Sequence, residues 1–333
     1  MTGAYHITVS NRYVKYDFTI QRNITVIRGN SATGKTTLIE MIREYQEAED
    51  SGIYLNSEKP CVVLYGRDWE ERLKKISGAI VFIDESSRFS NSEAFASAIQ
   101  GTDNYYVIVS RERLANLPFS IREIYGIRES GKYNRLESPY TLNEFYQIYG
   151  EKPEVPFTPG VVITEDTNSG YTFWKHFCSQ KDLPCEAAGG KSRVLKKIRD
   201  LDQKGGICLA IVDGTAFGSE MELLMEYIRY QNKEIRLYAP ESFEYLILSS
   251  GLLPSKEIAR CLEKTYLYAD SAAFISWERY YTHLLTEETR DTEKRYQKSR
   301  LNPYYLSEKP SAMILDQVPD AIRWETEEHT DNK

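Results

Sequence analysis

A lysine and a hydroxyl residue follow two spaced glycines in residues 29–36, a combination suited to holding phosphates. This segment, here called the glycine-rich loop, has the sequence Gly-Asn-Ser-Ala-Thr-Gly-Lys-Thr and fits the pattern GxxxxGK[ST]. In such a loop the backbone amides wrap the phosphates, Lys35 neutralises their outer oxygens and Thr36 offers its hydroxyl to Mg²⁺. We therefore expect ATP and Mg²⁺ to bind here. The predicted nucleotide-binding residues are Gly29, Asn30, Ser31, Ala32, Thr33, Gly34, Lys35, Thr36 and Thr37.

Two acidic residues follow the apolar run 80–83 at the point where a buried strand would end. By itself an acidic pair at this point can be a simple turn. Together with the glycine-rich loop it predicts a site that binds the Mg²⁺ of a nucleoside triphosphate and positions the attacking water. Asp84 is expected to hold Mg²⁺ through water, and Glu85 to polarise the attacking water. The presence of Glu85 predicts hydrolysis as well as binding.

A second set of acidic residues follows three further apolar runs. Glu165, next to Asp166, follows 161–164 and Asp213 follows 207–212, while Glu241 and Glu244 come after 235–238. The carboxyl ends of parallel strands lie along one edge of a sheet, so these carboxylates are expected to come together there. Oxygen ligands suit hard cations, which predicts Mg²⁺ or Mn²⁺ at this edge. The predicted metal ligands are Glu165, Asp213, Glu241 and Glu244.

A basic stretch lies between the acidic positions. Gly189 and Gly190 precede it and resemble a turn that tolerates phosphate and caps a helix. The stretch is either a solvated helix face or a contact for a nucleic-acid backbone. Its residues are Lys191, Arg193, Lys196, Lys197 and Arg199. On the helix predicted after Glu165, Trp174 is expected in the core and His176 at the surface or in packing.

Alternating strands and helices must position these groups, and the alternation favours parallel α/β architecture. An N-terminal β-hairpin over 5–20 precedes the strand that leads into the glycine-rich loop. Three prolines within 151–160 indicate a linker. The predicted organisation is an ATPase domain over 1–150, an α/β domain over 160–250, a helical region over 251–325 and a disordered tail over 326–333.

Composition narrows the class of protein. The 333 residues are 41% hydrophobic and 27% charged, which suits two globular domains. No stretch approaches the roughly 20 apolar residues of a membrane span, and the N-terminus lacks a secretory pattern, so we expect a cytoplasmic location without a membrane role. Five cysteines without CxxC spacing indicate neither a disulfide framework nor zinc. The net charge of −7 gives no general attraction to nucleic acid, so any such contact depends on the local basic stretch.

The hairpin, the glycine-rich loop and the acidic strand end resemble the heads of ABC-type ATPases of the SMC and OLD (overcoming lysogenization defect) kind over residues 5–128. The chain departs from those families because only 37–78 separates the two motifs and no LSGGQ-like signature is found. After the strand 105–109, Ser110-Arg111 stands where a switch histidine is common. The resemblance implies that Arg88 or Arg111 stabilises charge on the γ-phosphate.

The acidic strand ends resemble a TOPRIM domain, and an ATPase followed by TOPRIM is the domain order of OLD-family nucleases. Glu165 matches the first glutamate and Asp213 the first aspartate of DxD, whereas Thr215 replaces the second aspartate and Asp166 stands where glycine is common. Either the site is altered or Glu220 substitutes. The resemblance implies phosphodiester cleavage with metal ions, with Glu165 and Asp213 as catalytic residues and Glu165 as the general base.

Three functions compete. The leading hypothesis is an ATPase coupled to a TOPRIM-like, metal-dependent nuclease in defence against mobile DNA such as phage, or in DNA processing. The alternative is a nucleotide-switched interaction or regulatory ATPase whose TOPRIM-like domain does not cut and binds a partner. A small-molecule kinase is the third, although no lid is recognisable. A protein partner or homo-oligomer is expected in either of the first two cases.

Overall fold

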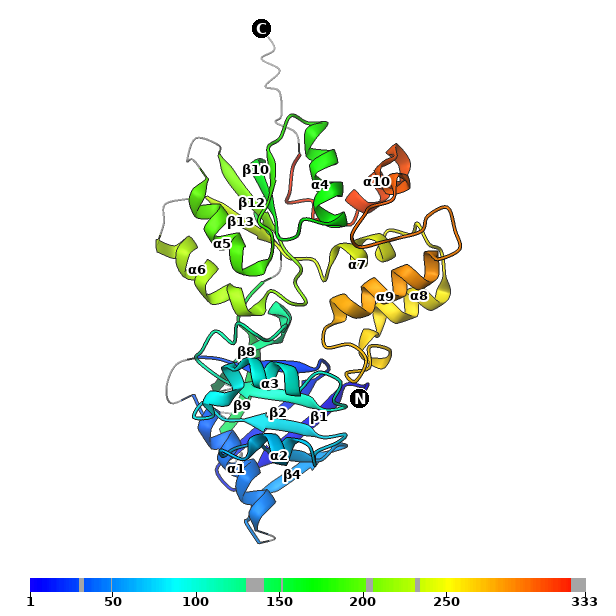
Figure 1. Ribbon diagram of the computed structural model, residues 1–333. Coiled ribbons are helices and arrows are strands. Elements are labelled where there is room, and N and C mark those ends of the chain that lie inside the picture. The colour runs from blue at the N-terminus through cyan, green and yellow to red at the C-terminus, as the bar shows by residue number, and fades with distance from the viewer. Residues whose placement is uncertain are drawn as a thin grey trace. The chain divides into compact units, whose positions relative to one another are not determined.

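The computed structural model describes residues 1–29, 33–48, 50–129, 141–150, 152–201, 206–230 and 234–324. The chain divides into two compact units (Figure 1). Unit 1 comprises Met1–Tyr149 and Glu263–Trp277, and unit 2 comprises Gly150–Leu262 and Glu278–Lys333. The chain therefore passes between the units three times. The predicted α/β class is confirmed at this level, because unit 1 holds a large mixed sheet and unit 2 a parallel one.

Unit 1 is built on a nine-stranded sheet with the order β4-β1-β2-β9-β8-β3-β7-β6-β5. The strands are β1 (Tyr5–Ser10), β2 (Val14–Ile20), β3 (Ile24–Ile27), β4 (Tyr54–Ser57), β5 (Cys61–Val63), β6 (Ile80–Ile83), β7 (Tyr105–Val109), β8 (Ile124–Glu129) and β9 (Thr141–Gln147). β1 and β2 pair antiparallel, so the predicted N-terminal hairpin is present. From β8 to β5 all neighbouring strands are parallel, which places their carboxyl ends along one edge.

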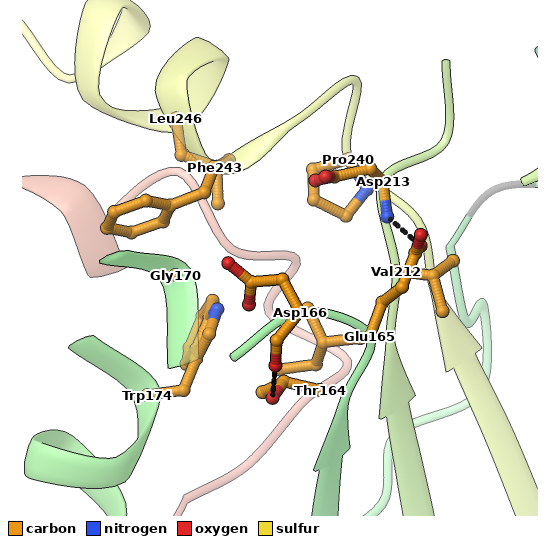
Figure 2. A pocket seen from close by; sticks show the side chains of 11 residues that line it. Thr164, Glu165, Asp166, Gly170, Trp174, Val212, Asp213, Pro240, Phe243 and Leu246 are labelled. Carbon is orange, nitrogen blue, oxygen red and sulfur yellow. Dashed lines mark hydrogen bonds between the residues drawn. The ribbon is translucent and has the colours of Figure 1, made fainter. Parts of the chain in front are cut away.

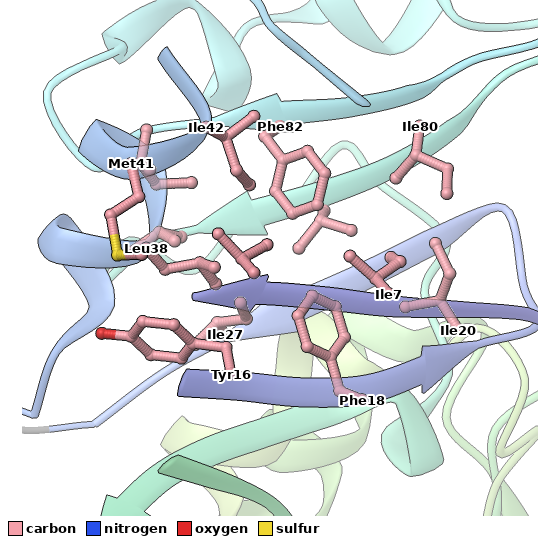
Figure 3. Packing of buried hydrophobic residues seen from close by; sticks show 14 of the residues in the cluster. Ile7, Tyr16, Phe18, Ile20, Ile27, Leu38, Met41, Ile42, Ile80 and Phe82 are labelled. Atoms are coloured by element: carbon pink, nitrogen blue, oxygen red, sulfur yellow. The ribbon is translucent and has the colours of Figure 1, made fainter. Parts of the chain in front are cut away.

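The core of unit 1 lies between this sheet and the helix that follows β3. The helices of the unit are α1 (Lys35–Glu47), α2 (Trp69–Leu73) and α3 (Glu93–Ala98), with 3₁₀ turns η1 (Arg88–Asn91), η2 (Ile121–Glu123) and η6 (Thr265–Leu267). Leu38 and Ile42 lie one helical turn apart in α1 and are fully buried with Ile27 and Phe82 of the sheet (Figure 3). Burying these side chains fixes the start of α1 against the end of β3.

Residues 263–277 join unit 1 from far along the chain. The Met1 ammonium donates to Asp270 Oδ1 at 2.7 Å, and Asn23 Nδ2 donates to the Phe274 carbonyl at 2.8 Å. The Arg22 guanidinium lies 3.6 Å from the centroid of the Trp277 ring. The sequence grouped this segment with a C-terminal helical region, but its contacts belong to unit 1 because its partners flank β1 and β3.

Unit 2 contains a parallel sheet with the order β11-β10-β12-β13. Its strands are β10 (Pro159–Thr164), β11 (Cys185–Ala187), β12 (Ile207–Ile211) and β13 (Ile235–Tyr238). Its helices are α4 (Ser169–Ser179), α5 (Lys191–Asp200), α6 (Met221–Tyr230), α7 (Phe243–Ser249), α8 (Lys256–Glu263), α9 (Trp277–Thr289) and α10 (Glu308–Leu315), with 3₁₀ turns η5 (Gly218–Glu220) and η7 (Pro303–Leu306). In Figure 1, α4 lies on one side of this sheet and α5 and α6 lie on the other.

The order of the four strands creates a switch point. From β10 the chain crosses to β11 on one side, and from β12 it crosses to β13 on the other. Connections that leave in opposite directions open a crevice at the carboxyl ends of the two central strands, where ligands bind in open α/β sheets. The predicted helical composition over 255–300 is interrupted in the structure, because 268–276 and 290–302 contain no helix. The predicted disordered tail, 326–333, lies outside the described residues.

Candidate functional site

The glycine-rich loop joins β3 to α1, and its Gly29 and residues 33–36 are described, as is Thr37; Asn30, Ser31 and Ala32 lie outside the described residues. Gly34 precedes the first helical residue with φ 84°, a left-handed conformation that favours glycine. A Cβ atom on Gly34 would lie 2.7 Å from the Tyr16 hydroxyl, which donates to the Gly34 carbonyl at 2.7 Å. Burial raises the pKa of Tyr16 to about 12, so the hydroxyl stays a donor. Both constraints explain why glycine occupies this position.

Lys35 is the first residue of α1 and is only 5% exposed. Its Nζ donates to the Gly29 carbonyl at 2.8 Å and to Thr33 Oγ1 at 3.0 Å, so the ammonium lies over its own loop. Burial and then the nearby Arg111 lower the pKa of Lys35, while Glu85 acts in the opposite direction. The lysine, the arginine and the glutamate therefore share one electrostatic environment.

The acidic pair is positioned by β6, and β7 separates β6 from β3 in the sheet. Arg111, just beyond the end of β7, places Nε 2.8 Å from Glu85 Oε1. Asp84 Oδ2 accepts from the Ser86 amide at 3.2 Å and from Ser86 Oγ at 2.6 Å. Asp84 Oδ1 is buried without a hydrogen-bond partner in the part of the chain that is described, and the Thr36 side chain is exposed. An unpartnered carboxylate oxygen beside the loop fits a Mg²⁺–triphosphate ligand.

In unit 2, Glu165 and Asp213 meet at the switch point between β10 and β12. The Asp213 amide donates to Glu165 Oε2 at 3.0 Å (Figure 2). Both residues and Asp166 line a cavity of about 20 Å³, roughly the space of one water molecule. The Gly190 amide, at the start of α5, donates to the Glu165 carbonyl at 2.7 Å. The predicted convergence of Glu165 and Asp213 is thus present, and the glycine turn lies beside them.

The two carboxyl groups resist ionisation. Burial raises the pKa of Glu165 to about 7, against an ordinary value of 4.5, and the neighbouring Glu278 acts in the same direction. Burial and then Glu278 and Glu165 raise the pKa of Asp213 well above its usual range. Desolvation and crowding of like charge are the features that mark functional carboxylate sites, although structural clusters share them.

A lysine that sequence reasoning missed supplies positive charge to this cluster. Lys298 Nζ lies 3.7 Å from Glu244 Oε1 and forms an ion pair with Glu278. Burial alone would lower the pKa of Lys298. The carboxylates of Glu244, Glu278 and Asp213 outweigh this effect and raise it above its ordinary value. Glu244 is 2% exposed, and its Oε1 also accepts from the Tyr296 hydroxyl at 2.8 Å. No local motif marks Lys298, because its partners are distant in sequence.

The remaining acidic residues have other surroundings. Asp166 accepts from the amides of Asn168 at 3.2 Å and Tyr171 at 3.0 Å, so it caps the start of α4. Glu241 is buried but does not line the cavity, and its carbonyl accepts from the Thr215 amide at 3.2 Å. Glu220 accepts from Ser219 Oγ at 3.2 Å. Within the described ranges, no three or more His, Cys, Asp or Glu residues are placed to hold a metal ion. The four predicted ligands Glu165, Asp213, Glu241 and Glu244 are thus not grouped as a metal site among the described residues.

The basic stretch forms α5, and its side chains have different partners. Lys191 Nζ donates to the Ala216 carbonyl at 3.4 Å, and its charge lowers the pKa of Glu165. Lys197 pairs with Glu186 Oε2 at 2.5 Å, and the Arg199 guanidinium lies 5.1 Å from the centroid of the Tyr227 ring. Of the other two, Arg193 lies against Gly189 and Lys196 is exposed. Lys191 is therefore the member placed beside the acidic cluster. Trp174 is buried, as predicted, and also lines the cavity, while His176 is partly exposed.

The raised pKa of Glu165 predicts a pH-dependent effect of Glu165→Gln. The folded state holds the proton of Glu165 more tightly than the unfolded state, so ionising this carboxyl group destabilises the folded protein. The loss of stability begins near pH 4 and reaches its full size above about pH 7. The glutamine should therefore stabilise unit 2 by about 1–2 kcal/mol at pH 8, since 1.36 kcal/mol corresponds to one pKa unit and partial exposure reduces the effect. Near pH 4 the two proteins should be equally stable. Urea denaturation at both pH values measures this, and an equal gain at both would contradict it.

Comparison with models of known protein families, with curated proteins and with solved structures found no match. None of the described helices has the length and apolar character needed to cross a membrane.

Proposed function

We propose that unit 1 binds and hydrolyses ATP with Mg²⁺. The observation that supports this most is the grouping of Lys35, Glu85 and Arg111 at the carboxyl ends of β3, β6 and β7. A lysine at a helix start, a carboxylate and a second cation along one strand edge are the parts that phosphoryl transfer needs. The motif order and the strand placement also agree with the resemblance to ABC-type ATPases of the SMC and OLD kind.

The residues have distinct roles in this proposal. The start of α1 and the glycine-rich loop hold the phosphates with amides, and Lys35 turns from its own loop to the outer phosphate oxygens. Asp84 and Thr36 would hold Mg²⁺, which supplies charge neutralisation across the phosphates. Glu85 orients the attacking water and accepts its proton, and Arg111, which contacts Glu85, stabilises negative charge on the γ-phosphate. Of the two arginines considered for that role, Arg88 lies in η1 and lines a neighbouring pocket.

Glu85→Gln separates hydrolysis from binding. The amide keeps the shape of the side chain but cannot accept the proton, so phosphate release should fall about a hundred-fold. The affinity for Mg²⁺–ATP should stay within about three-fold, because Glu85 does not hold the phosphates. Steady-state phosphate release and equilibrium binding of a fluorescent ATP analogue measure the two effects. Glu112→Gln is the matched control, since Glu112 accepts from Asn91 Nδ2 at 2.8 Å and should leave both unchanged. Unaltered hydrolysis in Glu85→Gln would exclude this residue as the base.

For unit 2 we propose a TOPRIM-like module, with two functions to be separated. Nucleic-acid cleavage is favoured by the meeting of Glu165 and Asp213 at the switch point beside the start of α5, where backbone amides and Lys191 suit a phosphate. A non-cutting module that binds a partner is favoured by Lys298, whose ammonium already compensates the carboxylates. In the second case ATP hydrolysis would switch the partner interaction.

A nicking assay distinguishes the two functions. Supercoiled and single-stranded DNA, and RNA, are incubated with the protein and either Mg²⁺ or Mn²⁺. Cleavage that is lost in both Glu165→Ala and Asp213→Ala supports the nuclease, with Glu186→Ala as the control because Glu186 pairs with Lys197 away from the cavity. Absence of cleavage with every metal and substrate supports the non-cutting module.

A further inference from the structure

Besides the cavity of unit 2, the protein has a pocket in unit 1, beside Asp84 and Glu85. Arginine and aromatic side chains line this pocket. It is open to solvent and has a volume of about 670 Å³, within the range of small-molecule sites. None of the described residues of the glycine-rich loop lines it. Arg43, which does, follows Lys35 by eight residues in α1, about 12 Å along the helix axis at 1.5 Å per residue. The pocket is therefore distinct from the phosphate cradle.

Three arginines give the pocket a positive charge. Arg43, Arg67 and Arg88 line it, and no acidic residue is among its lining residues. Arg43 Nε is buried and makes no hydrogen bond in the described structure. The whole chain carries a net charge of −7, so this concentration of guanidinium groups opposes the global charge. Guanidinium groups bind phosphate through paired charge-assisted hydrogen bonds, which a single lysine cannot provide.

Aromatic rings form another part of the wall. Trp69 and Phe89 stack with centroids 4.8 Å apart and planes 9° from parallel, and the Tyr65 ring lies 4.8 Å from the Arg43 guanidinium. All three line the pocket. Phe95 packs edge-on against Trp69 from the protein interior, which fixes the stacked pair in place. Rings held rigidly beside guanidinium groups suit a planar base attached to a phosphate.

We propose that this pocket binds a nucleoside monophosphate unit, with its phosphate on the arginines and its base against the aromatic wall. The unit comes either from a free nucleotide or from a single strand of nucleic acid, since both present the same chemistry. This binding does not require the glycine-rich loop.

The pocket is connected to the Asp84 side chain of the proposed hydrolytic site through Ser86. Ser86 lines the pocket, and its amide and hydroxyl both donate to Asp84 Oδ2. A phosphate that recruits the Ser86 hydroxyl would weaken its hold on Asp84. On the basis of the proposed ATPase function, occupation of the pocket changes the rate of hydrolysis, and couplings of this kind are commonly about five-fold or more.

Binding is tested in the Lys35→Ala protein, so that the phosphate cradle does not contribute. The probes are AMP, a 5′-phosphorylated thymidine trinucleotide and inorganic phosphate, measured by isothermal titration. Arg67→Gln/Arg88→Gln in this background should weaken AMP and trinucleotide binding at least about ten-fold, because charge-assisted hydrogen bonds are lost. Arg12→Gln is the matched control, since Arg12 also lies over a tyrosine ring but outside the pocket. It should change affinity less than two-fold.

Each outcome decides the proposal. A trinucleotide that binds at least ten-fold more tightly than AMP identifies a nucleic-acid strand as the source, and equal affinities identify a free nucleotide. Phe89→Leu should weaken AMP several-fold and leave inorganic phosphate unchanged. The proposal is overturned if neither AMP nor the trinucleotide binds at millimolar concentration, if phosphate binds as tightly as AMP, or if the arginine substitutions have no effect while melting temperatures are unaltered.

The coupling is measured separately in the protein with Lys35 intact. The trinucleotide should change ATP hydrolysis about five-fold, and this change should disappear in Arg67→Gln/Arg88→Gln. A hydrolysis rate that does not respond to the trinucleotide overturns the coupling alone. Failure of Mg²⁺–ATP binding to the wild-type protein overturns the proposed ATPase function and leaves the pocket to be judged by the titrations in Lys35→Ala.

Discussion

Lys35→Ala is expected to weaken Mg²⁺–ATP binding at least about a hundred-fold and to abolish hydrolysis. Lys35 is 5% exposed and its ammonium is already held at the loop by Gly29 and Thr33, so its position for phosphate contact is prepared before the ligand arrives. Each charge-assisted hydrogen bond lost costs about 1.5–3 kcal/mol, and 1.4 kcal/mol is a factor of ten. Equilibrium binding and phosphate release measure the loss.

The control for this substitution is Lys15→Ala. Lys15 is a lysine of β2 in the same unit, but its Nζ pairs with Asp17 Oδ2 at 3.1 Å. The Lys15→Ala protein should bind ATP like the wild-type protein. Equal melting temperatures of Lys35→Ala and the wild-type protein would show that lost binding does not reflect unfolding. Normal affinity in Lys35→Ala would remove the central support for the ATPase proposal.

Lys298→Met is expected to destabilise unit 2 by about 2–3 kcal/mol at pH 8, less than the loss of a partner from a fully buried charge network because the Lys298 side chain is 33% exposed. The substitution leaves Glu244, Glu278 and Asp213 without the ammonium that stabilises their charge. Protonation of the carboxylates removes their mutual repulsion. Because the pKa of Asp213 is raised, this group takes up its proton first as the pH falls, so the loss of stability should shrink towards pH 4. Urea denaturation followed by fluorescence of Trp174 and Trp324, which stack in unit 2, measures it.

Two further variants make this test specific. Lys298→Met/Glu244→Gln should recover part of the lost stability, since it removes the most deeply buried of the uncompensated charges. Lys294→Met is the control, because Lys294 Nζ donates to the Leu252 carbonyl at 2.9 Å instead of to a carboxylate. It should cost about 1 kcal/mol, without dependence on pH. Equal losses in Lys298→Met and Lys294→Met would show that the cluster does not depend on the ammonium.

Local patterns were sufficient for the strands that are buried on both faces. Every residue of β3, β6 and β7 is buried; β6 and β7 appear in the sequence as continuous apolar runs, and β3 as a run of β-branched residues. The chemistry that follows these strands could therefore be located from the sequence. β9 was missed because it contains polar residues such as Asn143, and its pairing with β2 and β8 is long-range. Its partner β8 lies earlier in the chain, and residues 130–140 between the two strands lie outside the described residues.

The acidic cluster of unit 2 could be predicted in part. Parallel strands bring their ends together wherever they fall in sequence, which explains why Glu165 and Asp213 were correctly expected to meet. Strand position does not specify which other charged residues surround these carboxylates. Glu278 and Lys298 come from the far end of the chain, and no periodicity links them to the sheet. Asp166 was expected to be part of the acidic edge, but its role at the start of α4 became visible only with its amide partners.

The three passages of the chain between the units limit how the protein can be divided. A fragment that ends near residue 150 would lack 263–277, and with it the partners of Met1, Asn23 and Arg22. Such a truncation would expose a surface that full-length protein covers, and would favour aggregation over autonomous folding. Conversely, a protease that cuts the proline-rich linker once should leave two fragments that stay associated until the protein is denatured. The larger fragment still carries 263–277, which contacts the smaller fragment through Met1, Arg22 and Asn23.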